Sequence, residues 1–458
     1  MKRKFFAFVA LLAATLSLSS CLSSDDTTVE YTHDTAITAF SLGTLDRWSK
    51  TSAGKDTLLQ SNLDASGYKF YIDQTTREIY NADSLPCGAR DTAVLATITS
   101  KNSGPIIIMH ADYPELLDSA RYYSSSDSID FSTPRKIRVY NGDFSAYVTY
   151  KITVNVHKQL PDEFNWLPMA QANAKLAALS DLKAVAMGDY VYVFGKTSEG
   201  MKVYKTGNTD GVNWEEVTPL SDVVTFSADD YKSAVAMGDY LYILSNGTVY
   251  TSTDGRLWAS NGSDASLKQL IGASSKYLYA YTQAGISVST DQGATWTAQT
   301  LDNVVDSLPT KNISLSVSPI RSTKNAENLL LMGTHEDADT TATIWTHTVD
   351  YDSNSATENM WNYYKMEKNQ AYKMPAMDEV LTCSADSGLV ALGSNGKWYK
   401  SVKGGLTWRV DTLVTLPNAF DNTTARFAFC RDTNKYYWII RNGYVWKGRF
   451  NKDGWRKE

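Results

Sequence analysis

The stretch Ala184-Val185-Ala186-Met187-Gly188-Asp189-Tyr190-Val191-Tyr192 recurs 50 residues later as Ala234-Val235-Ala236-Met237-Gly238-Asp239-Tyr240-Leu241-Tyr242. Each copy predicts a strand, a Gly-Asp turn and a second strand, because apolar residues flank two turn-forming residues on both sides. A near-identity of this length is very improbable by chance, and repeats of about 40 to 50 residues are typical of β-propeller blades. The sequence therefore predicts a β-propeller over residues 159–458.

The second part of the repeat is a turn that ends in tryptophan. Its fullest version, Ser289-Thr290-Asp291-Gln292-Gly293-Ala294-Thr295-Trp296, resembles the Asp-box pattern Ser-x-Asp-x-Gly-x-Thr-Trp, and a second full-length frame has Lys403 in place of Asp. In such a turn the Asp and Ser side chains form local hydrogen bonds, Gly supplies an unusual backbone angle, and Trp packs between sheets. We therefore assign structural roles to Asp210, Trp214, Asp254, Trp258, Asp291, Trp296 and Trp408.

The spacing of these tryptophans predicts the number of blades. Trp214, Trp258, Trp296, Trp361, Trp408 and Trp455 are separated by 44, 38, 65, 47 and 47 residues, with Trp361 assigned to a blade that carries a long insertion. Six blades are favoured and seven are possible. Trp455 is too close to residue 458 for another strand to follow, so we expect the segment Phe164–Met169 to supply the last outer strand and close the ring, which removes exposed sheet edges.

Residues 30–158 predict a separate domain of short strands. Alternating segments recur along it, and Asn141-Gly142 separates two of them, which is a strong hairpin signal because both residues tolerate positive φ. About seven strands in 130 residues suggest an immunoglobulin-like β-sandwich. The expected fold class is therefore all-β.

The start of the chain predicts export. Residues 1–20 combine a basic start with a short apolar run, which is the layout of a signal peptide, and no later stretch is long and apolar enough to span a membrane. Leu18-Ser19-Ser20-Cys21 resembles the bacterial lipobox, which implies lipidation of Cys21. Residues 21–29 are a polar, flexible tether. We expect an outer-membrane lipoprotein at the cell surface or, alternatively, facing the periplasm.

Composition excludes some function classes. The chain has 44 Lys plus Arg and 50 Asp plus Glu, and its basic residues are scattered, which disfavours nucleic acid as a partner. The remaining cysteines, Cys87, Cys383 and Cys430, form no disulfide framework or metal-type pair. Buried thiols are favoured for Cys383 and Cys430, although a bridge between them stays open. No cofactor and no metal site are expected.

The Asp-box also occurs in sialidases, but the rest of the sequence gives little support for that activity. A sialidase-like site needs an arginine cluster, a Tyr with a Glu partner, and an acid, whereas the arginines of this propeller are few and two of them lie in or beside the Asp-boxes. His335 and His347 fall in one predicted insertion near acidic residues, where a solvated loop is favoured over a metal site. No catalytic residue is assigned.

A binding face is the remaining expectation. Propeller ligands usually sit at the central mouth, for which the candidate loops are residues 219–231, 333–343, 364–379 and 413–426. Aromatic side chains beside hydrogen-bonding groups suit glycan or protein surfaces. The alternative is that several of these side chains pack between blades. The candidate binding residues are Phe226, Tyr231, Tyr364, Tyr372, Lys373, Phe420 and Arg426.

As a whole, the chain resembles uncharacterised Bacteroidota surface lipoproteins with an N-terminal Ig-like domain and a C-terminal Asp-box-type propeller. The resemblance implies no assigned activity. With the candidate binding loops, it favours a non-enzymatic envelope lipoprotein that binds glycan or protein, and the alternative is a sialidase-like or other propeller glycoside hydrolase or lyase.

The Bacteroidota resemblance also implies O-glycosylation. In these bacteria, Asp followed by Ser or Thr and then an apolar residue or Thr is a glycosylation pattern, and it recurs in this chain. Ordinary turn chemistry explains Asp-Ser and Asp-Thr but does not demand the third residue. The candidates in the N-terminal domain are Thr35, Thr57, Ser84, Thr92, Ser119 and Ser128.

Overall fold

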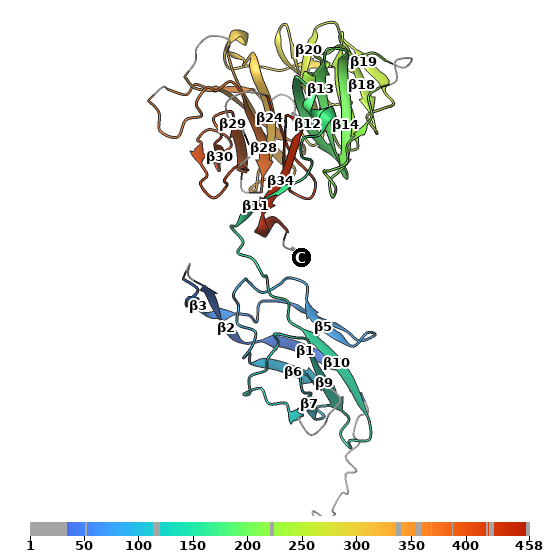
Figure 1. The fold of residues 1–458 in the computed structure, drawn as a ribbon, viewed down its shortest axis with the longest axis vertical. Coiled ribbons are helices and arrows are strands. Elements are labelled where there is room, and N and C mark those ends of the chain that lie inside the picture. Colours follow the sequence, from blue (N-terminus) through green and yellow to red (C-terminus); the bar gives the residue numbers. More distant parts are fainter. Residues whose placement is uncertain are drawn as a thin grey trace, which may run out of the picture. The chain divides into compact units, whose positions relative to one another are not determined.

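The computed structural model describes residues 34–50, 53–112, 120–219, 224–335, 340–353, 360–367, 369–386, 388–417, 420 and 426–454. They divide into two compact units, residues 34–158 and residues 159–454 (Figure 1). The predicted signal peptide, Cys21 and the tether lie outside the described residues. Among the described residues, no helix is long and apolar enough to span a membrane.

The first unit is built of strands. Its largest sheet has the order β4-β5-β10-β9-β7-β8, in which only β10 and β5 run parallel, and two pairs, β1-β6 and β2-β3, complete the unit. The strands are β1 Ile37–Leu42, β2 Thr44–Lys50, β3 Asp56–Asp64, β4 Phe70–Asp73, β5 Glu78–Asn81, β6 Ala96–Ser100, β7 Ile106–Ile108, β8 Arg121–Tyr122, β9 Arg135–Tyr140 and β10 Tyr147–Thr153.

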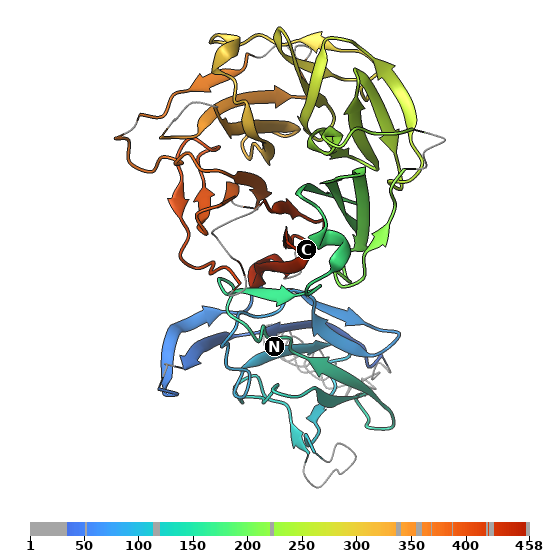
Figure 2. The ribbon, with the colours of Figure 1, turned by 45° about the horizontal axis from the view of Figure 1, so that its top comes forward.

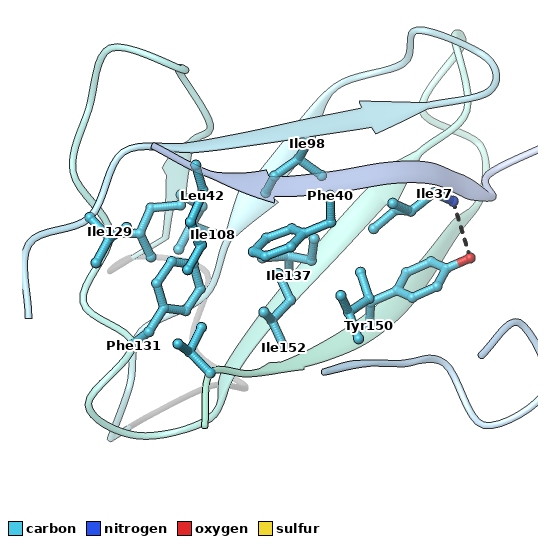
Figure 3. Packing of buried hydrophobic residues seen from close by; sticks show 14 of the residues in the cluster. Ile37, Phe40, Leu42, Ile98, Ile108, Ile129, Phe131, Ile137, Tyr150 and Ile152 are labelled. Atoms are coloured by element: carbon cyan, nitrogen blue, oxygen red, sulfur yellow. Dashed lines mark hydrogen bonds between the residues drawn. The ribbon is translucent and has the colours of Figure 1, made fainter. Parts of the chain in front are cut away.

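The core of this unit lies between the β1-β6 pair and the larger sheet (Figure 3). Period-2 alternation explains it: in β9, Ile137 and Val139 are fully buried while the residues between them are partly exposed. Phe40 packs edge-on against Phe70, with ring centroids 4.7 Å apart. The Tyr150 hydroxyl accepts a hydrogen bond from the Ile37 amide at 3.3 Å, which joins β10 to β1.

The predicted hairpin between β9 and β10 forms, but not as a two-residue turn. Residues 141–146 connect the strands, and positive φ falls on Phe144 (59°) rather than on Asn141 or Gly142. The reason is the Asn141 side chain, which is buried, accepts from the Ala146 amide at 3.0 Å and donates to the Ser145 hydroxyl at 2.8 Å. The side chain therefore stabilises a longer loop.

The second unit is a ring of sheets around a central axis (Figure 2). Its described residues form six four-stranded antiparallel sheets, with the orders β12-β13-β14-β15, β16-β17-β18-β19, β20-β21-β22-β23, β24-β25-β26-β27, β28-β29-β30-β31 and β32-β33-β34-β11.

The bounds of these strands are β11 Phe164–Pro168, β12 Asp181–Met187, β13 Tyr190–Thr197, β14 Gly200–Gly207, β15 Glu215–Glu216, β16 Val235–Met237, β17 Tyr240–Ser245, β18 Thr248–Ser252, β19 Ala259–Ser263, β20 Leu267–Ala273, β21 Leu278–Thr282, β22 Gly285–Ser289, β23 Thr297–Ala298, β24 Lys311–Pro319, β25 Ala326–Thr334, β26 Thr343–Asp350, β27 Asn362–Tyr364, β28 Val380–Ala385, β29 Gly388–Gly393, β30 Trp398–Ser401, β31 Arg409–Val410, β32 Ala428–Arg431, β33 Tyr437–Arg441 and β34 Tyr444–Phe450. Short helical turns are α2 Ala174–Ala177, η3 Asp230–Ser233, η4 Val305–Ser307 and η5 Asn451–Gly454.

The ring is closed in two ways. The first strands of successive sheets, β12, β16, β20, β24, β28 and β32, contact one another in turn, and β32 contacts β12 again. At the outside of the last sheet, β11 pairs antiparallel with β34, from Phe164 opposite Phe450 to Pro168 opposite Trp446. The predicted closure by the segment Phe164–Met169 is therefore confirmed.

The repeated nonapeptides form equivalent hairpins. β12 and β13 turn at Gly188-Asp189, and β16 and β17 turn at Gly238-Asp239. The two glycines have φ values of 55° and 58°, a left-handed conformation that side chains with a Cβ rarely adopt. This backbone requirement explains why the turn is repeated with its sequence intact.

The Asp-box-like turns contain the hydrogen bonds assigned to them above. Asp254 accepts from the Arg256 and Leu257 amides at 2.8 and 2.9 Å, and the Ser252 hydroxyl accepts from the Gly255 amide at 2.9 Å. Asp210 accepts from the Val212 and Asn213 amides in the same way, whereas Asp291 accepts from both the amide and the hydroxyl of Thr295. Each following Trp donates from Nε1 to the Gly carbonyl, including Trp408, whose turn has Lys403 in place of Asp.

The tryptophans of these turns pack against the preceding sheet. Trp258 lies among residues of β13, and Trp408 lies among residues of β25 and β26. Trp361 immediately precedes its outer strand, β27, and is buried against β21 and β22 in the same way. The predicted place of Trp361 between sheets is therefore confirmed, whereas Trp455 lies outside the described residues.

Candidate functional site

One end of the ring gathers polar side chains from several sheets. We call this end the mouth and define it by Asp181, Tyr231, Asn312, Glu379 and Arg426. Each of them lies within the first two residues of the first strand of a sheet or in the segment just before that strand. Because every first strand runs the same way through the ring, their starting ends meet.

Arg426 connects three sheets at the mouth. Its Nε lies 3.7 Å from Asp181 Oδ2, and its Nη1 donates to Asn312 Oδ1 at 3.3 Å and to the Asp378 carbonyl at 3.4 Å. The Arg426 side chain is 48% exposed. These distances are at the long end of hydrogen bonding, so the guanidinium keeps donor capacity for a ligand.

Glu379 is the buried carboxyl group of the mouth and is only 7% exposed. Its Oε2 accepts from the Phe427 amide at 2.9 Å. Burial raises the pKa of Glu379 to about 8; the Phe427 hydrogen bond and the Arg426 and Arg441 charges act in the opposite direction, and Asp181 adds to the rise. Glu379 is therefore predominantly protonated at neutral pH.

Tyr231 and Lys183 complete the polar wall between β12 and η3. Tyr231 is buried, and both its burial and its hydrogen bond with the Asp181 carboxylate raise its pKa. Lys183 Nζ donates to the Lys232 carbonyl at 2.9 Å, and Gln269 Nε2 reaches the same carbonyl at 3.4 Å. Burial lowers the pKa of Lys183 to about 8.

Neutral hydroxyl groups lie further along the first strands. The Thr382 hydroxyl lies 2.8 Å from that of Ser314 and 2.5 Å from that of Ser316. The Ser314 hydroxyl also accepts from the Thr382 amide at 3.0 Å. These contacts join β24 to β28 without any charge.

The structure separates the predicted binding residues into three groups. Arg426 and Tyr231 lie at the mouth. Phe226 and Phe420 are buried between sheets, at 6% and 7% exposure, as the packing alternative describes.

The third group consists of Tyr364, Tyr372 and Lys373. Tyr364 is the last residue of β27, and the other two lie between β27 and β28. The Tyr364 hydroxyl accepts from Gln370 Nε2 at 2.8 Å, and Tyr372 is 53% exposed with the Arg409 guanidinium 4.1 Å from its ring centroid. Lys373 follows Tyr372 and is partly exposed. The Tyr364–Gln370 hydrogen bond and the Tyr372–Arg409 contact do not involve a mouth residue.

Sequence reasoning did not select Asp181, Lys183, Asn312 or Glu379. A signal was available, because Lys183 interrupts an otherwise apolar strand and Asp378-Glu379 directly precedes another. These residues come together only when the ring of sheets is formed, so no local sequence motif predicts that they are neighbours.

His347 corrects one expectation. It lies in β26, not in a solvated insertion, and it is 1% exposed and stacked on Trp361 with ring centroids 4.7 Å apart. Burial lowers its pKa to about 4. His347 is part of β26, the third strand of its sheet, and its side chain is buried by stacking on Trp361. Among the described residues, no group of three or more His, Cys, Asp or Glu side chains is arranged to hold a metal ion.

Cys383 and Cys430 are buried, free thiols on the neighbouring first strands β28 and β32. This agrees with the favoured alternative of buried core residues. Cys87 is partly buried.

The candidate glycosylation residues differ in exposure. Thr57, Thr92 and Ser128 are exposed, Ser84 is partly exposed and Thr35 is 9% exposed. Ser119 lies outside the described residues.

Two surface cavities lie away from the mouth. One, of about 690 Å³, lies beside α2 and the turn that ends in Trp214. The other, of about 680 Å³, lies between the β24–β27 and β28–β31 sheets and is lined by Arg321, Asn328, Asp386 and Lys403 among others. Neither of these two cavities includes a residue that defines the mouth.

Comparison with known families follows this division of the chain. Residues 160–458 match the DUF6242 beta propeller domain, and residues 40–154 match the N-terminal domain of DUF6242, a domain of unknown function. This chain belongs to the DUF6242 family. The ring of sheets is the DUF6242 propeller, so the all-β class and the propeller are established. No curated protein matches the chain.

Several solved structures are similar to the DUF6242 chain at low sequence identity. A streptogramin B lyase is 9% identical with a TM-score of 0.36, covering 64% of this chain and 100% of its own. An α-L-arabinofuranosidase from Fusarium graminearum, in complex with an iminosugar inhibitor, is 11% identical with a TM-score of 0.38, covering 63% and 98%. An endo-arabinase from Bacteroides thetaiotaomicron is 9% identical with a TM-score of 0.28, covering 53% and 95%.

Proposed function

We propose that this protein is a non-enzymatic cell-envelope lipoprotein that binds glycan or protein through the mouth of its propeller. The observation that carries the proposal is the convergence of Asp181, Tyr231, Asn312 and Arg426 from four different sheets. Polar groups that converge from separate elements of a rigid scaffold are typical of ligand sites. The lipid anchor would be Cys21, and the location would be the outer membrane, at the cell surface or facing the periplasm.

The finer architecture is part of the same proposal. We take the six sheets as six blades, because their first strands contact one another in a complete cycle. We take the N-terminal unit as an Ig-like sandwich that acts as a spacer, because its core is enclosed between sheet layers.

A glycoside hydrolase or lyase is the second candidate, favoured by one observation. Burial raises the pKa of Glu379 to about 8, this acid lies near Asp181, and a pair of acidic residues is used in glycoside hydrolysis. Binding without catalysis is preferred because Glu379 is buried and its Oε2 is occupied by the Phe427 amide. A sialidase-like mechanism has less support, since the arginines near Glu379 are Arg426 and Arg441 among the described residues.

The binding test uses the full chain on a glycan array and a protein-interaction screen, followed by product analysis of each bound glycan. We expect retention without turnover. Arg426→Gln should weaken binding about tenfold or more, because a charge-assisted hydrogen bond contributes about 1.5 to 3 kcal/mol. Arg256→Gln, which removes an exposed guanidinium from an Asp-box turn, should leave affinity unchanged. Turnover would overturn the non-enzymatic proposal, and equal affinity of both variants would exclude the mouth.

The covalent modifications can be tested by intact-mass measurement of protein from its native host. We expect a mature chain that starts at a lipidated Cys21 and carries heterogeneous sugar mass. Replacing the exposed Thr57, Thr92 and Ser128 by Ala should reduce that mass stepwise, and Cys21→Ala should remove the lipid and release the protein from the membrane. A mass equal to the unmodified polypeptide would refute both modifications.

A further inference from the structure

Lys403 is the one departure from Asp in the two full-length Asp-box frames. Ser401-Val402-Lys403-Gly404-Gly405-Leu406-Thr407-Trp408 keeps every other fixed position of the frame that contains Asp291. The turn still forms, since the Gly405 amide donates to the Ser401 hydroxyl at 3.0 Å and Trp408 Nε1 donates to the Gly405 carbonyl at 2.7 Å. Lys403 is exposed and is not needed for either of these hydrogen bonds.

The turn that contains Lys403 borders the cavity of about 680 Å³. This cavity lies at the end of the ring opposite the mouth, because β24 opens at the mouth near Asn312 and reaches the cavity at Ser318 and Pro319. Six residues of extended strand separate the two ends by roughly 20 Å. The cavity is therefore a separate place from the mouth.

The charge of the cavity is positive. Its charged lining residues are Arg321, Asp386 and Lys403. The Asp386 carboxylate is already paired with Arg431 Nη2 at 2.8 Å and with Lys435 Nζ at 2.6 Å, so two cations outside the lining compensate it. Arg321 Nη2 donates to the Asp386 backbone carbonyl at 2.7 Å, which fixes its guanidinium at the cavity. Arg321 and Lys403 therefore leave a net positive charge there.

Neutral hydrogen-bonding groups accompany these cations. Ser318, Asn328 and Thr346 contribute hydroxyl and amide groups to the lining, and Asn328 Nδ2 makes only a long contact, 3.4 Å, with the Gly404 carbonyl. The volume lies within the range of sites for small ligands, not of macromolecular interfaces. Cations beside neutral hydroxyl and amide groups suit an anionic group on a hydroxyl-rich molecule.

We propose that this cavity is a second binding site, for a small sugar that carries a carboxylate or sulfate, with Lys403 and Arg321 contacting the anionic group. The site does not depend on the mouth or on the function proposed for it. The Asp found in the equivalent frame would repel such a ligand, so Lys403 gives the turn a role that Asp291 does not have.

The test is isothermal titration of the full chain with three probes: digalacturonic acid, a sulfated N-acetylglucosamine and uncharged lactose. We expect binding of at least one charged sugar and none of lactose. Lys403→Asp and Arg321→Gln should each reduce that affinity at least tenfold. Lys268→Asp makes the same charge change at an exposed lysine on β20, near the mouth, and should leave the affinity within twofold.

Lys403→Asp also separates binding from folding. The new carboxylate can accept from the Thr407 amide as Asp291 accepts from the Thr295 amide, so the melting temperature should stay the same or rise while binding is lost. Equal binding of lactose, absence of binding by both charged sugars, or full affinity in Lys403→Asp would overturn the proposal. Ligand binding at the mouth should be unaffected by Lys403→Asp. The proposal for the cavity and the proposal for the mouth can therefore be refuted separately.

Discussion

Replacing Phe164 and Trp166 together by Ala is expected to destabilise the propeller unit by roughly 3 to 5 kcal/mol, because two partly buried aromatic rings are lost and each should cost less than a fully buried ring. Phe164 packs against Trp398 and Phe450, with ring centroids 5.8 and 5.1 Å apart, and Trp166 Nε1 donates to the Thr415 carbonyl at 2.7 Å. Both side chains lie on β11 and contribute to its attachment to the last sheet. Their loss should leave β34 with a weakly paired edge.

Urea denaturation followed by tryptophan fluorescence measures this effect. Of the 12 tryptophans, only Trp48 lies before residue 159, so the signal reports mainly on the propeller unit. The matched control is Tyr190→Ala with Tyr240→Ala, which removes two aromatic rings that are 44% and 40% exposed. The control should cost less than about 1 kcal/mol, as most exposed sites do. Equal losses in the two double variants would show that β11 does not stabilise the ring.

Glu379→Gln is expected to change how stability depends on pH. The folded state holds the Glu379 proton up to a pKa of about 8, whereas an unfolded Glu releases its proton near its ordinary pKa. Between these values the folded state binds more protons than the unfolded state, so the stability of the wild-type protein falls as pH rises through this window. Gln stays neutral and can still accept from the Phe427 amide through its side-chain oxygen.

The free energy of unfolding of Glu379→Gln, relative to wild type, should therefore increase between pH 5 and pH 8 by on the order of 3 kcal/mol. The control is Asp378→Asn, which neutralises the exposed neighbouring carboxyl group. This variant keeps Glu379, so its stability should still fall between pH 5 and pH 8 as that of the wild-type protein does. If the Glu379→Gln curve were also parallel to wild type, Glu379 would not titrate abnormally in the folded protein.

The ring could be predicted from the sequence because its determinants are local. The Gly-Asp hairpins need positive φ at Gly188 and Gly238, and the turns before the outer strands need a tryptophan to fill the space between sheets. The first requirement leaves a Gly-Asp pair in the first two repeats, and the second leaves a tryptophan just before the outer strand. The segment Phe164–Met169 was predicted by a different argument, the need to pair an exposed edge.

The mouth could not be predicted in the same way. Arg426, Asp181 and Asn312 are far apart in sequence and meet only because first strands from different sheets share an axis. The aromatic residues chosen from loop composition were less informative. Phe226 and Phe420 are buried because loops in a tight ring also fill gaps between sheets.

The pairing of β11 with β34 also fixes the order in which the molecule can be completed. Phe164 and Phe450 are partners in one sheet although almost the whole propeller sequence lies between them. During synthesis, the last sheet cannot form until residues 444–450 have been made. Until then, the earlier sheets cannot be part of a closed ring. Bringing such distant segments together reduces the conformational entropy of the chain, and this loss occurs when β11 pairs with β34. The closed ring therefore requires both β11 and β34, and it can form only after the segments of all the other sheets have been made.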